Sequence, residues 1–311
     1  MQKIFLKIII LFLLVFSSLT VFNLLYTRTN YWKNTVTNAI SKFKNVPEGI
    51  QLANVGSSHG VHSFDYNDVP CQSFNFALGA QLYLYDYAIL RQYADRFSKN
   101  AILLIPISYF QINLLKNDFS DQRARYYHFL DKEYMDFYSI SEKMSLTFYP
   151  VLSAGITLKF IIKDEQSTLK FLTEPELMSD GIAKHRNFTI GGNVGFDAGE
   201  DGFFHNKLLI SQIIEFCYDH DIRPVLVTTP ITSVLNDIFK EKTPAFFDNF
   251  YRFTRELQEA YPSLLYFDYS HDPRFENDFS LFRDSDHLNI DGAKKFTAVV
   301  ISDLQTRGLL P

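Results

Sequence analysis

Residues 49–64 read GIQLANVGSSHGVHSF, a short apolar run that passes directly into a polar turn. The run at residues 51–55 is strand-sized and apolar on both faces, which is typical of a strand in a parallel sheet covered by helices. Gly56 and Gly60 let the chain turn sharply, so a helix after the turn would point a serine hydroxyl and N–H into the crevice outside the strand ends. A plain polar turn with an Asn or Ser helix cap is the alternative.

The same two patterns alternate along the rest of the chain. Strand-sized apolar runs recur at residues 73–78, 101–107, 224–229 and 264–268. Amphipathic helical patterns lie between them, at residues 80–97, 206–219, 245–261 and 290–306. This alternation predicts an α/β fold with an open, doubly wound parallel sheet and right-handed crossovers.

Two segments interrupt or precede this domain, which we expect over residues 48–311. Residues 8–26, inside an N-terminal segment at 1–27, are nineteen uncharged residues and predict an uncleaved transmembrane helix. Basic residues flank both ends of the run, so charge does not decide its orientation. Residues 28–47 are expected to be a linker. Residues 110–200 are too long for a simple loop and predict an inserted helical subdomain followed by a loop beside the site.

Composition excludes several classes of function. The net charge of −5 and the pI near 5.9 provide no broad basic surface, so we do not expect nucleic-acid binding. The chain contains no CxxC, no HExxH and no Cys/His cluster, so neither a metal nor a cofactor is expected. Cys71 and Cys217 are predicted to be buried small hydrophobic residues, with a disulfide between them as the alternative.

A second polar segment, RDSDHLN at residues 283–289, leads into the last helical pattern. A serine becomes nucleophilic when a base takes its proton and an acceptor holds that base in the right tautomer. Asp284 and His287 are three residues apart, so the carboxylate can meet imidazole Nδ1 while Nε2 points outward. Asp286, one residue before His287, cannot easily meet Nδ1 and also leave Nε2 facing outward. The alternative is an N-terminal helix cap with acidic residues that the helix dipole favours.

Together, the Gly-x-Ser block after the first strand and the Asp-x-x-His block before the last helix resemble the SGNH or GDSL hydrolase superfamily. The GSSH form, the single anchor and the large insertion are similar to its envelope branch, which contains DltD-like D-alanyl transfer proteins and alginate O-acetylation proteins. The resemblance covers roughly residues 48–108 and 203–308. It implies a flavodoxin-like sheet, with Ser58 as nucleophile, His287 as base and Asp284 as the acid that orients the base.

The resemblance also implies an oxyanion hole, formed by the N–H groups of Ser58 and Gly79. The family's third donor, an asparagine after the third strand, is missing here, and Ser108 or Tyr109 could donate instead. His59 and Tyr109 are our candidates for substrate binding. His62 could line the same pocket, whereas packing at the start of the helix is the alternative for His59.

These features lead us to expect a membrane-anchored serine O-acyltransferase or esterase that acts on an ester-bearing cell-envelope glycan. The resemblance places it at the outer face of a bacterial cytoplasmic membrane. Expected partners are the envelope polysaccharide or acyl ester substrate, the membrane, and a membrane-bound acyltransferase. The alternative is a catalytically silent scaffold that binds polysaccharide or docks on that acyltransferase, and the missing third donor favours it. A simple tethered esterase would release free acid without a glycan acceptor.

Overall fold

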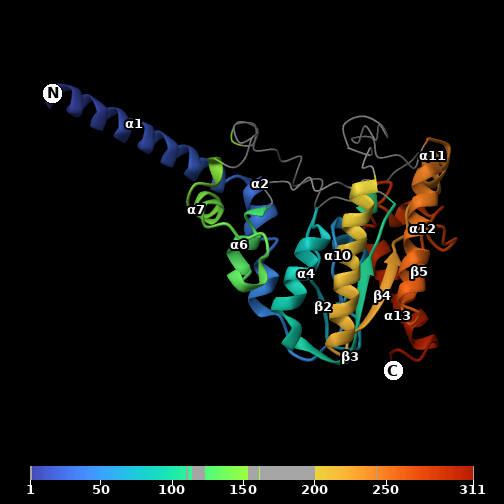
Figure 1. Ribbon diagram of the computed structural model, residues 1–311. Coiled ribbons are helices and arrows are strands. Elements are labelled where there is room, and N and C mark those ends of the chain that lie inside the picture. The colour runs from blue at the N-terminus through green and yellow to red at the C-terminus, as the bar shows by residue number, and fades with distance from the viewer. Residues whose placement is uncertain are drawn as a thin grey trace. The chain divides into compact units, whose positions relative to one another are not determined.

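The computed structural model of the protein describes residues 2–109, 111–113, 123–152, 161, 200–242 and 244–310 (Figure 1). These residues belong to two compact units. The anchor unit combines Met1–Asn45 with Asp118–Glu174, and the sheet unit combines Val46–Asn117 with Pro175–Pro311. Much of the insertion expected at residues 110–200, including most of the loop expected after its helical subdomain, lies outside the described residues.

The sheet unit is built on five parallel strands in the order β2-β1-β3-β4-β5. Neighbouring strands are in register so that Asn54 of β1 lies level with Asn75 of β2 and Leu104 of β3. Because all the pairs are parallel, the carboxyl ends of the strands meet at one edge of the sheet. The predicted α/β fold with a parallel sheet is therefore confirmed. The strands are β1 Ile50–Asn54, β2 Ser73–Asn75, β3 Phe97–Pro106, β4 Arg223–Thr228 and β5 Leu265–Asp268.

Helices cover both faces of this sheet. On one face, Phe296 and Val300 of α13 pack against alternate strand residues such as Leu52 and Ile102. The intervening strand residues point to the opposite face, where they are also buried. On that face α10 packs against α4 and β4, and both helices lie in front of the sheet in Figure 1. The helices are α3 Ser58–Ser63, α4 Tyr83–Gln92, α10 Glu200–Asp219, α11 Ser233–Lys242, α12 Pro244–Ala260 and α13 Ile290–Thr306.

The helix boundaries differ from the predicted ones in instructive ways. The last helix spans the predicted residues, but the helix expected at 80–97 is shorter, because Ala80 has a left-handed φ of 52° and Tyr93 leaves the helical conformation. A short turn, η3 (Ala94–Arg96), then leads into β3, which begins four residues before the predicted start. Helix α11 was not predicted. The remaining short turns of the sheet unit are η4 (Gln111–Asn113) and η7 (Phe279–Leu281).

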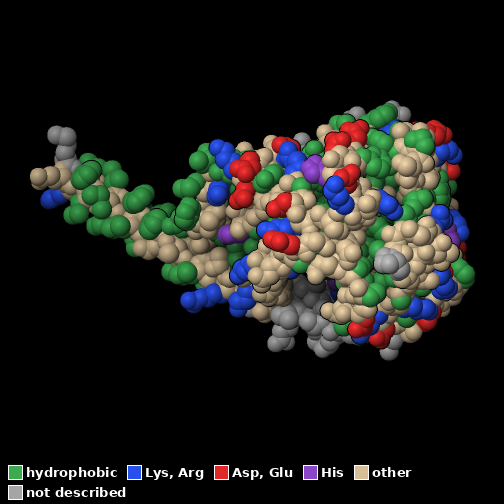
Figure 2. Space-filling model, turned by 90° about the horizontal axis from the view of Figure 1, so that it is seen from below, with side chains coloured by type: hydrophobic (Ala, Val, Ile, Leu, Met, Phe, Trp, Pro, Cys, Tyr) green, Lys and Arg blue, Asp and Glu red, His purple; other side chains and the backbone are tan. Residues whose placement is uncertain are grey.

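The anchor unit contains one long helix and several short ones. Helix α1 (Gln2–Thr27) is long and apolar enough to cross a membrane by its length and composition. Hydrophobic side chains cover the visible side of this helix in Figure 2. Residues 28–47, expected as a linker, contain helical turns and the buried side chains of Trp32, Val36 and Phe43. The other elements are α2 Asn30–Trp32, η1 Lys33–Thr37, η2 Ser41–Asn45, α6 Tyr126–Phe129, η5 Lys132–Tyr134, α7 Ile140–Phe148 and η6 Pro150–Leu152.

Both cysteines are free, so the disulfide alternative does not hold. Cys217 is buried in α10 as predicted, and burial raises the pKa of its thiol. Cys71 is only half-buried, because it lies just before β2 rather than within the strand. Neither thiol is placed or activated as a nucleophile.

Candidate active site

The turn that follows β1 positions Ser58 as the first residue of α3. We call residues 55–60 the nucleophile turn. Gly56 has φ of 112°, and a Cβ there would lie 3.2 Å from the Pro106 ring, so only glycine fits without strain. Ser57 is the N-cap residue, but its side chain makes no capping hydrogen bond. The Ser58 N–H lies in the first turn of the helix, where backbone donors have no partner within the helix.

Close packing fixes α3 against the first two strands. A Cβ on Gly60 would lie 2.5 Å from the Val55 carbonyl oxygen and 2.7 Å from Ala77 Cβ, so any larger residue would push the helix outward. Two asparagine side chains, one from β1 and one from β2, also bind Gly60. Asn54 Nδ2 and Asn75 Nδ2 donate to the Gly60 carbonyl oxygen at 3.1 Å and 2.9 Å. The position of Ser58 therefore depends on β1 and β2 together.

Asp86 of α4 is a further support that the sequence did not reveal. Its buried carboxylate accepts the Gly56 N–H at 2.8 Å and the Gln81 side-chain amide at 2.6 Å. Burial raises the pKa of Asp86 to about 7, although these two hydrogen bonds oppose the shift. Only a contact between residues thirty positions apart identifies this role, so no local pattern could have predicted it.

The histidine loop, residues 282–289, carries Asp284 and His287 to the start of α13. A bridge between Phe282 and Leu288 closes it, and the Arg283 N–H donates to the His287 carbonyl oxygen at 2.9 Å. Asp284 Oδ1 accepts the backbone N–H of His287 at 2.9 Å. Outside the loop, the Thr232 N–H and hydroxyl both donate to the Ser285 carbonyl oxygen.

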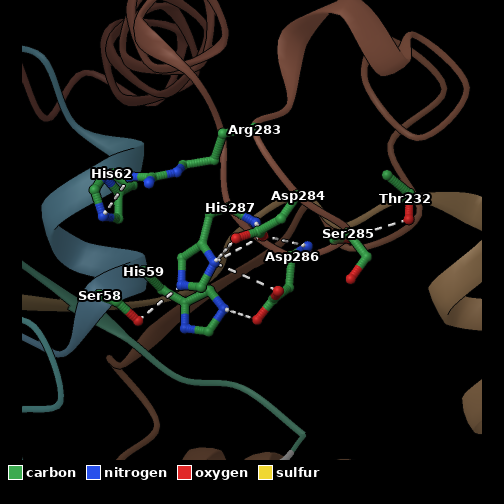
Figure 3. A network of polar contacts seen from close by, with 9 residues as sticks. All are labelled: Ser58, His59, His62, Thr232, Arg283, Asp284, Ser285, Asp286 and His287. Carbon is green, nitrogen blue, oxygen red and sulfur yellow. Dashed lines mark hydrogen bonds and ion pairs between the residues drawn. The ribbon is translucent and has the colours of Figure 1, made fainter. Parts of the chain in front are cut away.

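The nucleophile turn and the histidine loop are more than two hundred residues apart in sequence. Together they bring a hydroxyl, an imidazole and a carboxylate into one continuous series of hydrogen bonds (Figure 3). Ser58 Oγ lies 2.8 Å from His287 Nε2. On the other side of the ring, His287 Nδ1 lies 2.8 Å and 3.0 Å from the two carboxylate oxygens of Asp284. The arrangement has the geometry of a Ser-His-Asp triad, in which the acid holds the base in one tautomer. The three residues predicted from the sequence are thus brought together.

A second carboxylate lies beside the same imidazole. Asp286 Oδ1 is 3.4 Å from His287 Nδ1, farther than the 2.8 Å contact of Asp284, so Asp286 adds a second negative charge while Asp284 holds the ring. Burial disfavours the charged imidazole, but the negative charges of Asp286 and Asp284 outweigh it and raise the pKa of His287 to about 9. In turn, despite its own burial, the charge on His287 holds the pKa of Asp286 well below its usual range.

His59 lies underneath His287 rather than in a pocket. The two rings stack with centroids 4.8 Å apart and an interplanar angle of 16°, and His59 Nε2 lies 3.4 Å from Asp286 Oδ2. Burial lowers the pKa of His59, so this imidazole is neutral at neutral pH. Since only 4% of the residue is exposed, His59 supports the base and does not present a surface to substrate, contrary to our expectation.

His59, Asp286 and His287 also form the one group among the described residues that has metal-ligand character, with the ligand atoms all within 4.8 Å of one another. Imidazole binds a metal along its ring plane, through the nitrogen lone pair. Stacked, nearly parallel rings direct their lone pairs side by side rather than toward one point. The geometry therefore does not suit a shared ion, and Asp286 lies 3.4 Å from a nitrogen of each ring.

His62 and Arg283 face each other beside the base. His62 packs edge-on against the His287 ring, with centroids 5.4 Å apart, and Arg283 Nη1 lies 3.3 Å from His62 Nε2. Burial, reinforced by the charges of His287 and Arg283, lowers the pKa of His62. A neutral His62 can accept a hydrogen bond from the guanidinium, which remains charged.

The two other predicted oxyanion donors occupy different settings. The Leu78 N–H donates to the Gly56 carbonyl oxygen at 3.2 Å, which joins this segment to the nucleophile turn. Gly79 is the next residue along the chain, and it is exposed. Ser108 is buried and its Oγ accepts the Gln111 N–H at 3.3 Å, capping the turn after β3. This capping bond uses an acceptor site of the hydroxyl and leaves its hydrogen to be donated.

Tyr109, expected to bind substrate or donate to the oxyanion, points into the core instead. Its hydroxyl lies 2.5 Å from Ser270 Oγ, and its ring packs against Phe247 and Phe250 with centroids 4.6 Å and 4.7 Å away. With 1% of the residue exposed, Tyr109 has no surface for a substrate. An aromatic residue after a strand is as suited to a core as to a pocket, so the sequence alone could not separate the two roles.

No model of a known protein family matches this chain, and no curated protein matches it either.

Proposed function

We propose that this protein is a membrane-anchored serine acyl-transfer enzyme, an O-acyltransferase or esterase, in which Ser58 is the nucleophile, His287 the base and Asp284 the orienting acid. The observation that carries the proposal is the continuous hydrogen-bonded chain from Ser58 Oγ through both nitrogens of His287 to Asp284. A chance cluster of polar side chains would not place both ring nitrogens within 3.0 Å of the required partners.

The strand order supports the more specific assignment to a flavodoxin-like sheet of the SGNH hydrolase type. The order β2-β1-β3-β4-β5 matches the flavodoxin-like arrangement, whose ligands bind outside the carboxyl ends of the strands. Ser58 follows β1 at that edge, as the superfamily resemblance requires. A cell-envelope glycan as acceptor and an extracytoplasmic site on a bacterial cytoplasmic membrane follow from the same resemblance and from α1.

In the first half of the reaction, Ser58 Oγ attacks the carbonyl carbon of an ester and its proton passes to His287 Nε2. The carbonyl π electrons move to oxygen, and the N–H groups of Ser58 and Gly79 stabilise the resulting oxyanion. Asp284 stabilises the imidazolium that forms. When the tetrahedral intermediate collapses, the bond to the leaving alkoxide breaks and His287 returns the proton to it, so an acyl-enzyme and an alcohol remain.

In the second half, His287 takes a proton from the acceptor, which is either a glycan hydroxyl or water. The acceptor oxygen attacks the acyl carbon, the bond to Ser58 Oγ breaks, and the proton returns to Ser58. Transfer and hydrolysis differ only in which acceptor reaches the acyl-enzyme while water is excluded.

Ser108 is our candidate for the third oxyanion donor, because its hydroxyl hydrogen is available for donation.

The charge state of His287 should make the reaction depend on pH. An imidazole whose pKa is about 9 is protonated at neutral pH and must lose that proton before it can act as the base. We therefore expect kcat/KM to rise with pH up to about 9 and then to level off.

The direct test is covalent labelling of the full-length protein in detergent by a fluorophosphonate, together with turnover of a chromogenic acetyl ester at pH 9. Wild type should react with both reagents, and Ser58→Ala should lose both reactions. Ser57→Ala is the matched control, because Ser57 is adjacent but its side chain makes no capping bond.

Equal reactivity of wild type and Ser58→Ala with both reagents would contradict an acyl-transfer role for Ser58. The protein would then be better described as the silent envelope scaffold, a role that the buried Tyr109 and the missing asparagine donor would fit. Mass spectrometry of envelope glycans with and without the protein would then identify the acyl group and its acceptor.

A further inference from the structure

Helix α7 of the anchor unit exposes an apolar stripe on one face. Ile140, Met144 and Phe148 are spaced four residues apart along the helix, and Leu152 of η6 continues the series. All four side chains are more than half exposed. A contiguous group of large exposed apolar side chains marks an interaction surface far more often than an isolated one does.

The opposite face of α7 is already occupied by the protein. Leu146 is buried, and Glu142 accepts the Tyr127 hydroxyl at 2.7 Å and pairs with Arg123 at 3.3 Å. Ser139 caps the helix by accepting the Glu142 N–H. At 100° per residue, Glu142 and Leu146 lie about 180° from the centre of the exposed stripe. The rotation of α7 is therefore fixed, and the apolar stripe faces away from the described residues that α7 packs against.

The end of α7 is joined to the apolar helix α1. Asn23 Nδ2 donates to the Phe148 carbonyl oxygen at 3.0 Å, and the Val151 N–H donates to Asn23 Oδ1 at 3.3 Å. The rings of Phe16 and Tyr149 meet edge-on, with centroids 6.1 Å apart. Figure 1 shows α7 beside the C-terminal part of α1.

This junction sets the depth of the stripe relative to α1. Asn23 lies three residues before Tyr26, the end of the uncharged run, which is only about 5 Å at 1.5 Å per residue. The side chains of Val21, Phe22, Leu24 and Leu25 around this level are themselves exposed on α1. Two exposed apolar surfaces thus meet at the same level of one unit.

We infer that the apolar stripe of α7 and η6 lies in the interfacial zone of the lipid bilayer that α1 enters. The anchor unit would then contact the membrane through this stripe as well as through α1. Lys143, exposed on the flank of the stripe, is placed to meet anionic headgroups, as in other interfacial amphipathic helices. The Tyr149 ring, between the stripe and α1, reaches farther along the apolar part of α1, where it contacts Phe16. This inference does not depend on the proposed acyl-transfer activity.

The test uses the full-length protein in nanodiscs of phosphatidylcholine and phosphatidylglycerol, with lipids brominated on the acyl chain near the headgroup. Bromine quenches an indole that it contacts. Trp32, which is buried, is the one tryptophan of the chain and provides a constant background. We expect Phe148→Trp and Met144→Trp each to add fluorescence that the brominated lipids remove, with emission shifted to the blue. In Lys143→Trp, on the flank of the helix, the loss should be smaller.

Two results would overturn the inference. Red-shifted emission without quenching would place the stripe in water, and blue-shifted emission without quenching would mean that protein covers it. Using two positions one helical turn apart protects the result against a local packing defect at either position. A circular dichroism spectrum identical to that of wild type identifies the variants that have folded.

Discussion

The nucleophile turn and the histidine loop are held in place by different kinds of contact. The turn depends on residues from other elements, since Asp86 binds Gly56 and Asn75 binds Gly60. The loop depends largely on itself, because Asp284 binds the backbone of the residue that it orients. Tertiary contacts therefore place the nucleophile, whereas local hydrogen bonds place the base. Changes in the turn should damage folding and chemistry together, and changes in the loop should separate the two.

The largest effect is expected for Asp284→Asn. The asparagine oxygen can still accept the loop N–H groups at the Oδ1 position, but the amide NH₂ would then take the Oδ2 position, 3.0 Å from Nδ1, where a donor disfavours the Nδ1–H tautomer. Removing the acid in this way typically costs roughly 10⁴-fold in kcat. Ester turnover and the labelling rate measure the loss, while the thermal unfolding midpoint should change little. Full activity in this variant would mean that Asp284 does not orient the base.

Next in size is Gly60→Ala in the turn. The added Cβ would overlap the Val55 carbonyl oxygen, and overpacking of this kind typically costs about 1–3 kcal/mol, sometimes more. Urea unfolding should show the lost stability, and labelling of Ser58 should fall with it. Gly79→Ala is the matched control for stability alone, since a Cβ there meets no atom within 4 Å but the Gly79 N–H is a proposed oxyanion donor. Equal stability of the two variants would show that α3 can move without cost.

A smaller, pH-dependent change is expected for Asp286→Asn. The negative charge of Asp286 is the largest contribution that raises the pKa of His287, so its removal lowers that pKa. Because the neutral imidazole is the active form, the rise of kcat/KM should move to lower pH, and relative activity at pH 7 should increase. Asp95→Asn makes the same charge change at an exposed site of the sheet unit and should leave the profile in place. An unshifted profile in Asp286→Asn would show that Asp286 does not tune the base.

The smallest effect is expected for Thr232→Val. The hydroxyl donates to the Ser285 carbonyl oxygen at 3.1 Å and accepts the Leu235 N–H at the start of α11. Losing these bonds should cost about 1 kcal/mol of unfolding free energy, and the histidine loop should keep its own hydrogen bonds. Thr232→Ser retains the hydroxyl and should behave like wild type in denaturant titration. A loss of labelling larger than the loss of stability would mean that the loop needs this outside support.

The sequence predicted the features of the site that depend on local spacing. The three-residue separation of Asp284 and His287 is sufficient for their contact, and the periodic pattern of α13 gave the bounds of that helix. The position of Ser58 after the first strand followed from the glycines of the turn. In each case, the relevant interaction spans only a few residues, so the pattern of residue types contains it.

Features that depend on packing were not predictable in the same way. His59 stacks under His287, and Asp86 reaches the turn from α4, yet neither contact has a signature in the local sequence. The negative charge that Asp286 adds beside His287 has no such signature either, because the side-chain direction within a tight loop depends on its closing bridge. Tyr109 follows a strand toward the expected site but turns into an aromatic cluster contributed by α12. These outcomes required the relative positions of whole elements.

Gly292 in the first turn of α13 has a consequence for engineering. A Cβ at this position would lie 2.0 Å from the Leu281 carbonyl oxygen, and Asn289 caps the same turn by accepting the Gly292 N–H at 2.9 Å. The segment from Leu281 to Gly292 is thus a compact cassette, meaning a continuous piece of chain whose two ends pack directly against each other. Such a cassette could be grafted onto another parallel-sheet scaffold as one piece, carrying a pre-aligned base and acid, whereas its serine partner would have to be rebuilt within each new host.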